Sequence, residues 1–380
     1  MKKTRREFGL LSSLGLGGAL ASGGGFAAVR ENTEPRAHRI WEDPKFSGFE
    51  ISLVKGRGSE LVATFGRAPA GSETGDIVLT RARDGVASWQ QAVGVPLFSH
   101  PGAGHQLAAL ASLMNGTLIV STTRLKYVFE GKLRWRRGSA TDGVFVRDSP
   151  DGGYSWADAR KVDTSPFPIA WTRGSIVEMA DGSLLLPLAG QRSDSYRDVR
   201  ESMASFVMRS LDRGKTWNYH ATIAEDRHGS RDYDEPTLVR LLDGRLLCML
   251  RSHVSPRRDP PGGYLHMTLS EDGGATWSKV QKTSMWGHPA HLLALRDGRV
   301  LCTYGYRMHP GPGVRGCLSE DGVQWKPQDI FTVQALADLD SEHLQIGCPS
   351  SVELSDGRIL TAYQTWVEER QGLECSLYRV

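Results

Sequence analysis

The chain has 380 residues, of which 39% are hydrophobic and 23% charged, and its formal net charge at pH 7 is +3, which is ordinary for a globular protein. No long basic run occurs outside the N-terminus, so nucleic acid is not expected as a partner. The five cysteines lack CxxC spacing, and neither a His/Cys set nor a carboxylate-rich loop of the calcium type occurs, so we expect no metal and no cofactor.

Residues 1–28 have the pattern of a bacterial export signal. Lys2, Lys3, Arg5 and Arg6 form a basic head, and residues 10–28 are apolar and rich in glycine and alanine. Residues 4–10, TRREFGL, resemble the twin-arginine signal, which carries folded proteins across the inner membrane. The alternatives are an ordinary Sec signal or a membrane anchor behind a chance pair of arginines. We expect a periplasmic or secreted protein without stable membrane insertion after cleavage, at residues 19–21 or 25–27.

Short apolar runs on either side of turn dipeptides predict six β-hairpins in the rest of the chain. A polar lead-in, residues 29–44, precedes the first hairpin, whose turn is the looser sequence KGRG at residues 55–58. The other turns follow at intervals of roughly 54 to 66 residues and are Asn115-Gly116, Asp181-Gly182, Asp243-Gly244, Asp297-Gly298 and Asp356-Gly357. No segment of convincing length has the period of a helix, so we expect an all-β chain.

A second motif, an aspartate-containing turn followed by a tryptophan, occurs five times. Its clearest copy is LSEDGGATW at residues 269–277, and the other copies end at Trp89, Trp156, Trp217 and Trp325. The aspartate can accept hydrogen bonds from N–H groups of its own turn, the next glycine tolerates positive φ, and the tryptophan offers a large apolar surface. One repeating unit is therefore a hairpin, a third strand, this Asp turn and a fourth strand.

Repetition of this four-stranded antiparallel unit predicts a six-bladed β-propeller over residues 45–380. The sixth unit lacks the Asp turn because the chain ends at Val380, shortly after its expected third strand, residues 373–378. We expect residues 38–41 to supply the fourth strand of that blade and so to close the ring.

Asp turns of the form Ser-x-Asp-x-Gly-x-Thr-Trp, six blades and an export signal together resemble the sialidase superfamily. The resemblance covers about residues 45–380 and rests on a turn that is specific for this architecture rather than for any chemistry. It implies a glycoside hydrolase acting on a terminal acidic sugar of a glycan, either sialic-acid-like or a uronic acid. The alternatives are a uronate-directed polysaccharide lyase and a non-catalytic glycan-binding propeller.

The inner hairpin of blade four, YDEPTLVRLLDGRLLCMLRS at residues 233–252, contains the first candidate site. When two residues pair across a two-residue turn, the sum of their residue numbers is the same for every pair of that hairpin. This sum is 487 for the present turn, and the residue numbers of Glu235 and Arg251 add up to 486. They should therefore be near neighbours, with Tyr233 at the same end of the hairpin. The resemblance implies that Glu235 assists the nucleophile and that Arg251 is one of three substrate-binding arginines. A structural ion pair is the alternative.

Blade five contains a second candidate cluster. In this hairpin the residue numbers of a pair should add up to 595, so we expect His288 to pair with Arg307 and His291 to pair with Tyr304. Two histidines, an arginine and a tyrosine suit anion binding combined with proton transfer, because histidine titrates near neutral pH and arginine can bind a carboxylate through two hydrogen bonds.

Several arginines are expected near the axis of the ring. Arg307 competes with Arg315, which precedes the last Asp turn, for the third arginine of the family, and spacing does not separate them. Arg173 begins the inner strand of blade three and should point to the same rim as Arg251. Together these four arginines favour an anionic ligand such as a sugar acid.

The sequence departs from the sialidase pattern at three places. No Arg-Ile-Pro segment occurs in the first inner strand, residues 46–53, and Cys348 stands where the family has its nucleophilic tyrosine. A cysteine with a low pKa could itself act as a nucleophile. The acid/base of the family lies in the first-blade loop, where Glu73 and Asp76 are the candidates, although Asp76 could instead begin the third strand.

Overall fold

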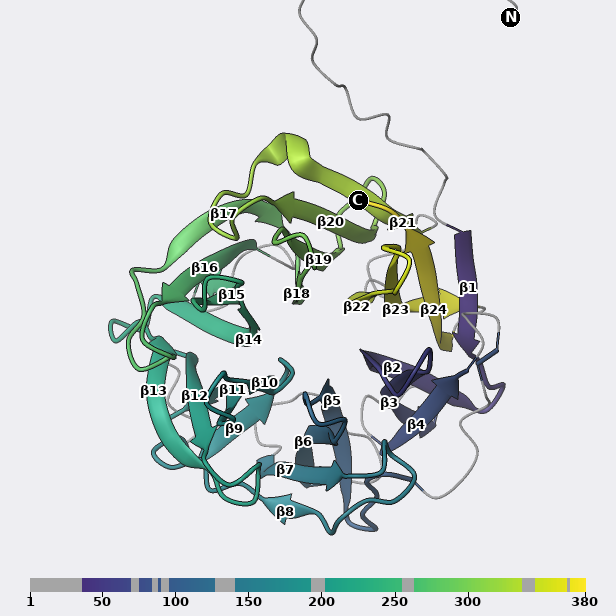
Figure 1. Cartoon of the computed structure of the whole chain (residues 1–380), viewed down its shortest axis with the longest axis horizontal. Helices are drawn as coiled ribbons and strands as arrows, with labels where there is room; N and C mark the ends of the chain where they lie inside the picture. Colours follow the sequence, from purple (N-terminus) through teal and green to yellow (C-terminus); the bar gives the residue numbers. More distant parts are fainter. Residues whose placement is uncertain are drawn as a thin grey trace, which may run out of the picture. The chain divides into compact units, whose positions relative to one another are not determined.

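The computed structural model describes residues 36–69, 75–83, 88–89, 96–126, 141–192, 202–254, 263–336, 346–367 and 370–380, all within one compact unit, residues 33–380. The regular elements of these residues are β-strands and one 3-10 turn, Pro327–Asp329, and the strands make six sheets arranged around an axis (Figure 1). The all-β, six-bladed propeller expected from the repeats is confirmed. Within the described ranges, no helix is long and apolar enough to cross a membrane.

Each sheet is one blade, and its first strand is the innermost (Figure 1). Blade one consists of β2 (Phe46–Lys55), β3 (Leu61–Pro69) and β4 (Asp76–Ala82). Blade two consists of β5 (Ala103–Ser112), β6 (Leu118–Lys126), β7 (Thr141–Ser149) and β8 (Arg160–Lys161). Blade three consists of β9 (Ile169–Thr172), β10 (Val177–Glu178), β11 (Leu184–Gln191), β12 (Ala204–Ser210) and β13 (Asn218–Ala224). Blade four consists of β14 (Arg231–Arg240), β15 (Leu246–Val254), β16 (Tyr264–Ser270) and β17 (Gln281–Trp286). Blade five consists of β18 (Ala290–Ala294), β19 (Val300–Tyr306), β20 (Gly313–Ser319) and β21 (Ile330–Ala335). Blade six consists of β22 (Gly347–Glu353), β23 (Ile359–Val367) and β24 (Arg370–Tyr378), together with β1 (Arg36–Trp41).

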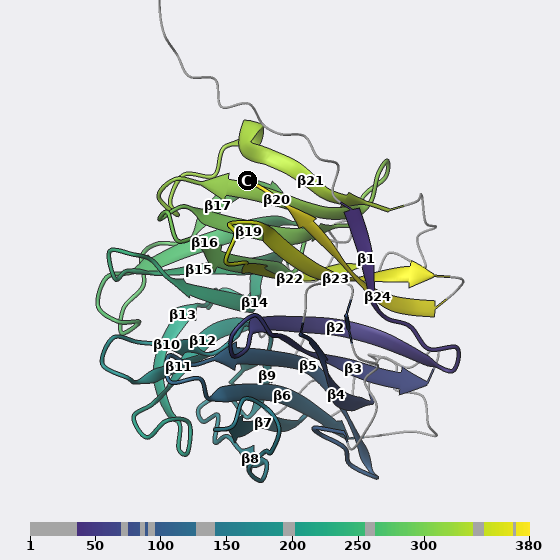
Figure 2. The same ribbon diagram turned by 45° about the vertical axis from the view of Figure 1, so that its right-hand side comes forward.

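The last blade combines both ends of the described chain. β1 pairs antiparallel with β24, with His38 opposite Cys375, and the sheet order is β1-β24-β23-β22 (Figure 2). The outermost strand of blade six therefore comes from the segment that precedes blade one. This pairing joins the ends of the ring by backbone hydrogen bonds and covers the outer edge of β24.

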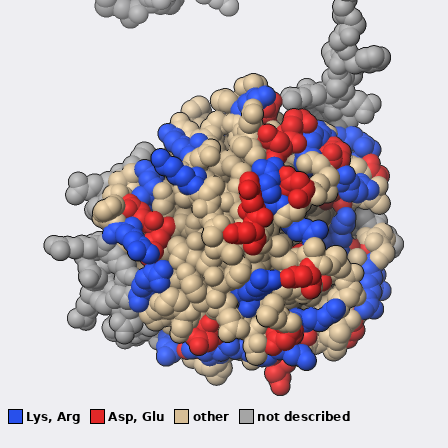
Figure 3. All heavy atoms as spheres, turned by 60° about the vertical axis from the view of Figure 1, so that its left-hand side comes forward, with Lys and Arg blue, Asp and Glu red and all other residues tan. Residues whose placement is uncertain are grey.

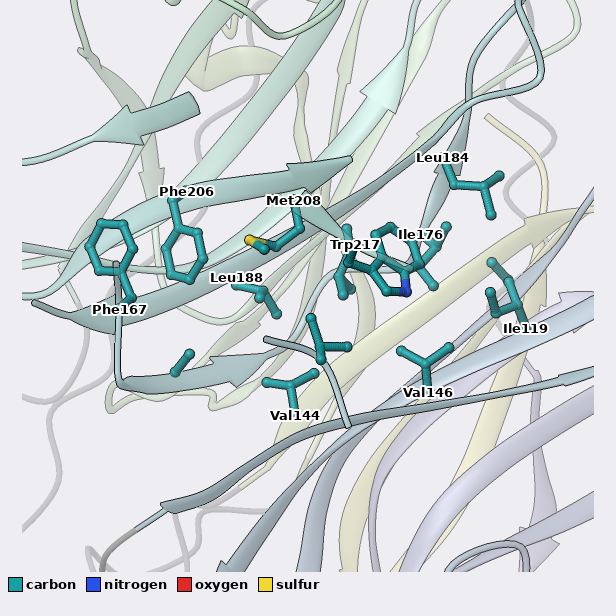
Figure 4. Packing of buried hydrophobic residues seen from close by; sticks show 14 of the residues in the cluster. Ile119, Val144, Val146, Phe167, Ile176, Leu184, Leu188, Phe206, Met208 and Trp217 are labelled. Carbon is teal, nitrogen blue, oxygen red and sulfur yellow. The ribbon is translucent and has the colours of Figure 1, made fainter. Parts of the chain in front are cut away.

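The hydrophobic core lies between neighbouring blades. One cluster joins β6 and β7 of blade two, through Ile119, Val144 and Val146, to the facing strands of blade three (Figure 4). Phe167 and Phe206 stack in the same cluster with their ring centroids 4.0 Å apart. Because each blade buries both faces against its neighbours, the inner strands are held rigidly around the axis.

The Asp turns connect the third and fourth strands, away from the axis. In the turn between β16 and β17, Asp272 accepts hydrogen bonds from the backbone and the hydroxyl of Thr276, at 2.9 and 2.6 Å, and these bonds lower the pKa of Asp272 to about 2. The indole N–H of Trp277 donates to the carbonyl oxygen of Gly274 at 3.1 Å. The turn thus uses the aspartate for its own structure.

Candidate functional site: the axial cluster

Each blade places one residue at an equivalent position on its inner strand. The hairpin turns supply the register: Leu113, Met179, Leu241, Leu295 and Leu354 donate their backbone N–H across the turn, and Gly56 does so in blade one. Six residues before each of these donors, the inner strands carry Glu50, Leu107, Arg173, Glu235, Pro289 and Cys348. We call these the axial positions, because the inner strands surround the centre of the ring (Figure 1).

Four axial residues have a backbone conformation that L-amino acids rarely adopt. The φ angles of Glu50, Leu107, Glu235 and Cys348 are 54°, 59°, 46° and 46°, and each residue lies where the pairing of its hairpin shifts register. A bulge of this kind turns a side chain away from the normal alternation of the strand. In blade three the inner strand is interrupted instead, between β9 and β10, at Arg173. Such strain is typical of functional sites.

Glu235 and Arg251 form an ion pair at the end of the inner hairpin of blade four. The carboxylate oxygen lies 2.9 Å from a guanidinium nitrogen, which confirms that these two residues are neighbours. Burial alone would raise the pKa of Glu235, but the positive charges of Arg251, Arg173 and Arg307 outweigh it and hold that pKa below its usual value. Glu235 is therefore an ionised carboxylate at neutral pH.

Arg307 joins the cluster from β19 and the loop that follows it. Its Nε donates to the carbonyl oxygen of Ile346 at 3.0 Å, and one of its terminal nitrogens lies 3.6 Å from the Cys348 sulfur. Blades five and six approach closely here: a Cβ on Gly347 would lie 2.7 Å from the Cα of Gly305, so only glycine fits. This close approach brings Arg307 against the axial position of blade six.

Cys348 is buried, with 6% of its surface exposed, between charged neighbours. Burial raises the pKa of its thiol, and this effect exceeds the opposing effect of Arg173 and Arg307. Arg173 also hydrogen-bonds to the Cys348 side chain. The thiol is thus neutral at physiological pH, the opposite of the thiolate that nucleophilic attack requires.

His288 lies buried beside these charges, with 2% of its surface exposed. Its ring packs edge-on against that of His253, with centroids 6.0 Å apart. Burial, followed by the charges of Arg251 and Arg307, lowers its pKa well below the usual value, so the imidazole is neutral. Neither ring nitrogen has a hydrogen-bond partner within the described part of the chain, and the same holds for Oε2 of Glu235 and Nε of Arg251.

Glu50 is the one charged axial residue that the motif analysis did not identify. Its Oε2 accepts the backbone N–H of Leu107 at 2.7 Å, and its charge acts on Arg173 and Cys348. The strand where the resemblance calls for an arginine thus presents a carboxylate to the axis. Counting six residues back from the hairpin turn of blade one, as in the other blades, would have identified Glu50 from the sequence.

The pairing predicted for blade five is wrong by one residue. His291 lies opposite Thr303, and Tyr304 lies opposite Ala290. Tyr304 is consequently buried, 1% exposed, in the hydrophobic cluster between blades four and five rather than beside His291. His288 and Arg307 do come together at the axis.

The structure separates the two competing arginines of blade five. Arg315 lies on β20, the third strand, where its guanidinium carbon is 3.5 Å from the centroid of the Tyr306 ring. Its charge is not among those that act on Glu235, whereas the charge of Arg307 is. Arg307 is therefore the arginine that belongs to the axial cluster.

The remaining candidates lie outside this cluster. Tyr233 packs edge-on against His266 with ring centroids 6.1 Å apart. Asp76 begins β4, as the alternative interpretation of its segment expected, and forms an ion pair of 3.4 Å with Arg67 on β3. Glu73 lies outside the described residues. No first-blade acid can be assigned from the described part of that loop.

The inner hairpins and Asp turns define this chain as an Asp-turn β-propeller of six blades. The chain belongs to the BNR repeat-like domain family, whose model matches residues 59–360. One curated relative, the oligoxyloglucan-reducing end-specific xyloglucanase of Emericella nidulans, is 28% identical over 134 residues. That match covers 33% of this chain and 16% of the relative, so the chain spans only a small part of the relative's length.

Solved structures share the fold over most of the chain. A protein of unknown function from Dyadobacter fermentans superposes with a TM-score of 0.77 at 24% identity, covering 90% of this chain and 98% of the other. The Hadza microbial sialidase Hz136 superposes with a TM-score of 0.65 at 15% identity, and the match covers 88% of this chain and 66% of the other. The α-L-arabinanase of Penicillium chrysogenum, complexed with arabinobiose, superposes with a TM-score of 0.61 at 13% identity, and the match covers 90% of this chain and 97% of the other. At these identities the likeness establishes the fold alone.

Proposed function

We propose that this protein is a glycoside hydrolase that removes a terminal acidic sugar from a glycan. The observation that carries this proposal is a set of buried polar atoms at the axis, on Glu235, Arg251 and His288, that have no hydrogen-bond partner among the described residues. Buried polar groups in folded proteins are nearly always hydrogen-bonded, so a site that leaves several unpartnered is suited to a polar ligand. Among its structural neighbours are proteins named as a sialidase and an arabinanase.

The charges of the cluster support an acidic sugar. Arg173, Arg251 and Arg307 face the carboxylates of Glu50 and Glu235, which leaves one positive charge in excess. A ligand carboxylate would balance that charge, and arginine binds carboxylates through paired hydrogen bonds. The excess is local, because acidic and basic side chains are interspersed over the face of the molecule shown in Figure 3.

The protonation states suggest how hydrolysis would proceed. Ionised Glu235 is suited to act as the base that activates a water molecule. The neutral, buried thiol of Cys348 favours direct attack by that water over a covalent intermediate on sulfur. Burial and the neighbouring arginines keep His288 neutral, and a bound sugar carboxylate would raise its pKa, which would allow it to donate a proton to the leaving oxygen.

The test is a screen of purified protein against sialosides and uronic-acid oligosaccharides. Arg251→Ala should weaken substrate binding by about 10- to 100-fold, the range for losing a hydrogen bond to a charged group. Arg209→Ala is the matched control, because Arg209, on the third strand β12, forms its ion pair with Asp181 in the hairpin turn and does not belong to the axial cluster. Full activity of Arg251→Ala on every cleaved substrate would exclude the axial cluster as the active site.

A uronate-directed lyase is the second candidate, and His288 is the observation that favours it. A neutral imidazole beside Arg251 and Arg307 could remove the proton next to a carboxylate whose charge those arginines neutralise. A lyase yields an unsaturated product that absorbs near-ultraviolet light, and a hydrolase yields none. Saturable binding without turnover, unchanged in Glu235→Gln, would instead identify a glycan-binding propeller.

We also propose that the protein is exported through the twin-arginine route. The basic head and apolar segment of residues 1–28 support this, and the five cysteines are buried and free of disulfides, as suits a chain that folds before export. Changing both Arg5 and Arg6 to lysine should leave the protein in the cytoplasm, as measured by cell fractionation. Export that persists in this variant would indicate a Sec signal.

A further inference from the structure

A small cavity, with room for about one or two water-sized spheres, lies on the axis next to the cluster. Its lining comes from all six blades and consists of Arg173 and the residues that follow the axial positions toward the hairpin turns, such as Ser52, Ser175, Thr237, His291 and Ser350. It is therefore displaced along the axis from the unpartnered atoms of Glu235, Arg251 and His288, none of which lines it.

The polar groups of this lining are arranged as hydrogen-bond donors. Nδ1 of His291 accepts the backbone N–H of Ser351 at 3.3 Å, which places the proton of the neutral ring on Nε2. The Ser52 hydroxyl accepts the N–H of Leu110 at 2.9 Å, so its own O–H remains to donate. Ser175 and Thr237, which also line the cavity, carry hydroxyls that can donate a hydrogen bond.

The charge of the cavity is positive. The guanidinium of Arg173 is its only charged group among the described residues, and no carboxylate side chain lines it. The positive charge of Arg173 also helps burial to lower the pKa of His291, to about 4, so the imidazole adds a dipole and no charge. A cation would be repelled, and a water molecule would find donors in excess of acceptors.

We propose that the axial cavity binds one small inorganic anion, such as chloride, between the Arg173 guanidinium, Nε2–H of His291 and the hydroxyls of Ser175 and Thr237. Blades three and four limit the width of the cavity, since a Cβ on Gly174 would lie 2.4 Å from the carbonyl oxygen of Pro236. The anion would also hold Arg173 in the position that it shares with the axial cluster.

Bromide serves as the probe because its anomalous scattering identifies it in a crystal. Crystals of the full chain soaked in sodium bromide should show an anomalous peak in the cavity, and the double variant Ser175→Ala, Thr237→Val should lose it. In solution, sodium bromide should raise the melting temperature of the wild type above its value in sodium gluconate of equal ionic strength, because gluconate is too large to enter. The variant should bind bromide at least about tenfold more weakly, as expected for losing two hydrogen bonds to an ion.

Controls separate ion binding from a folding defect and from the proposed enzymatic activity. The double variant should melt near the wild-type temperature in gluconate, and Ser284→Ala, on the outer strand β17, should retain the bromide peak. An empty or water-filled cavity in the bromide soak, or a peak that survives in the double variant, would overturn the proposal. Neither readout depends on a sugar substrate, so the anion site and the hydrolase proposal can fail independently.

Discussion

The carboxylate of Glu235 lies 2.9 Å from the guanidinium of Arg251, at a bulge where Glu235 has a φ of 46°. Only one carboxylate oxygen is used in this pair, and the other is buried without a hydrogen-bond partner in the part of the chain that the structure describes. An ion pair with purely structural purpose would be expected to satisfy both oxygens. The half-satisfied pair is the clearest structural sign that this position serves a ligand.

Replacing Glu235 with glutamine should lower kcat by about 10²- to 10⁴-fold, the usual contribution of a general base. Affinity for the acidic sugar should be kept, because the change removes a negative charge near the substrate carboxylate. Steady-state kinetics and binding calorimetry measure the two effects separately. Glu374→Gln is the matched control, since Glu374 pairs with Arg39 on the outer strands of blade six. An equal loss in both variants would contradict a role for Glu235.

Cys348→Ser should change kcat by less than about threefold, because a neutral thiol contributes no nucleophile. Iodoacetamide should label Cys348 slowly at pH 8, because burial raises the pKa of the thiol. Mass spectrometry of the alkylated protein measures the labelling rate. Rapid labelling together with loss of activity in the serine variant would instead identify a nucleophilic cysteine.

Alanine substitutions at two glycines of positive φ can distinguish the energetic cost of a steric clash from the cost of backbone strain. Gly214 has a φ of 84° and a Cβ there would lie 2.7 Å from Cδ1 of Ile119, whereas Gly182 has a φ of 79° and open space around it. Gly182→Ala should lower the free energy of unfolding by about 1–2 kcal/mol, the cost of the left-handed conformation. Gly214→Ala should cost about 1–3 kcal/mol more, because it also disturbs the core. Urea denaturation measures both, and equal losses would contradict this difference.

Stability should fall as the pH drops from about 6.5 to about 4, partly because of His105. This residue is 2% exposed, and burial, followed by the charge of Arg124, lowers its pKa to about 4. The unfolded chain binds a proton throughout this window and the folded chain does not, so protons favour unfolding, by up to about 1.4 kcal/mol per pH unit for one histidine.

The variant His105→Phe tests this pH dependence. Phenylalanine suits the site, since the ring of Phe98 lies 5.3 Å from that of His105. The variant should show a shallower fall of unfolding free energy between pH 6.5 and 4, as measured by urea denaturation at each pH. His100→Gln, an exposed neighbour, should keep the wild-type slope. A wild-type slope in His105→Phe would show that another group controls acid stability.

One error of the pairing rule has a simple cause. The rule assumed two-residue turns, but Leu295 and Arg299 close the hairpin of blade five, which leaves a loop of three residues with Gly298 at a φ of 96°. A loop of this length shifts every pair by one position. Tyr304 therefore enters the core, and Thr303 takes its place opposite His291. In blade four the same loop length makes the pairing sum 486, the sum for Glu235 and Arg251, and the bulge at Glu235 then places Asp234 opposite Arg251 without separating the ion pair.

The sequence by itself determined the architecture, because turn dipeptides and Asp turns are local signals that each recur in five of the six units and require only neighbouring residues. It also identified Glu235 and Arg251 as neighbours, since a hairpin brings its own ends together. Only the tertiary structure decided that Glu50, Arg173 and Arg307 meet at the axis and that Arg315 does not. That outcome depends on the closing of six blades into a ring and on bulges that turn single side chains inward, and neither is written in the spacing of any one hairpin.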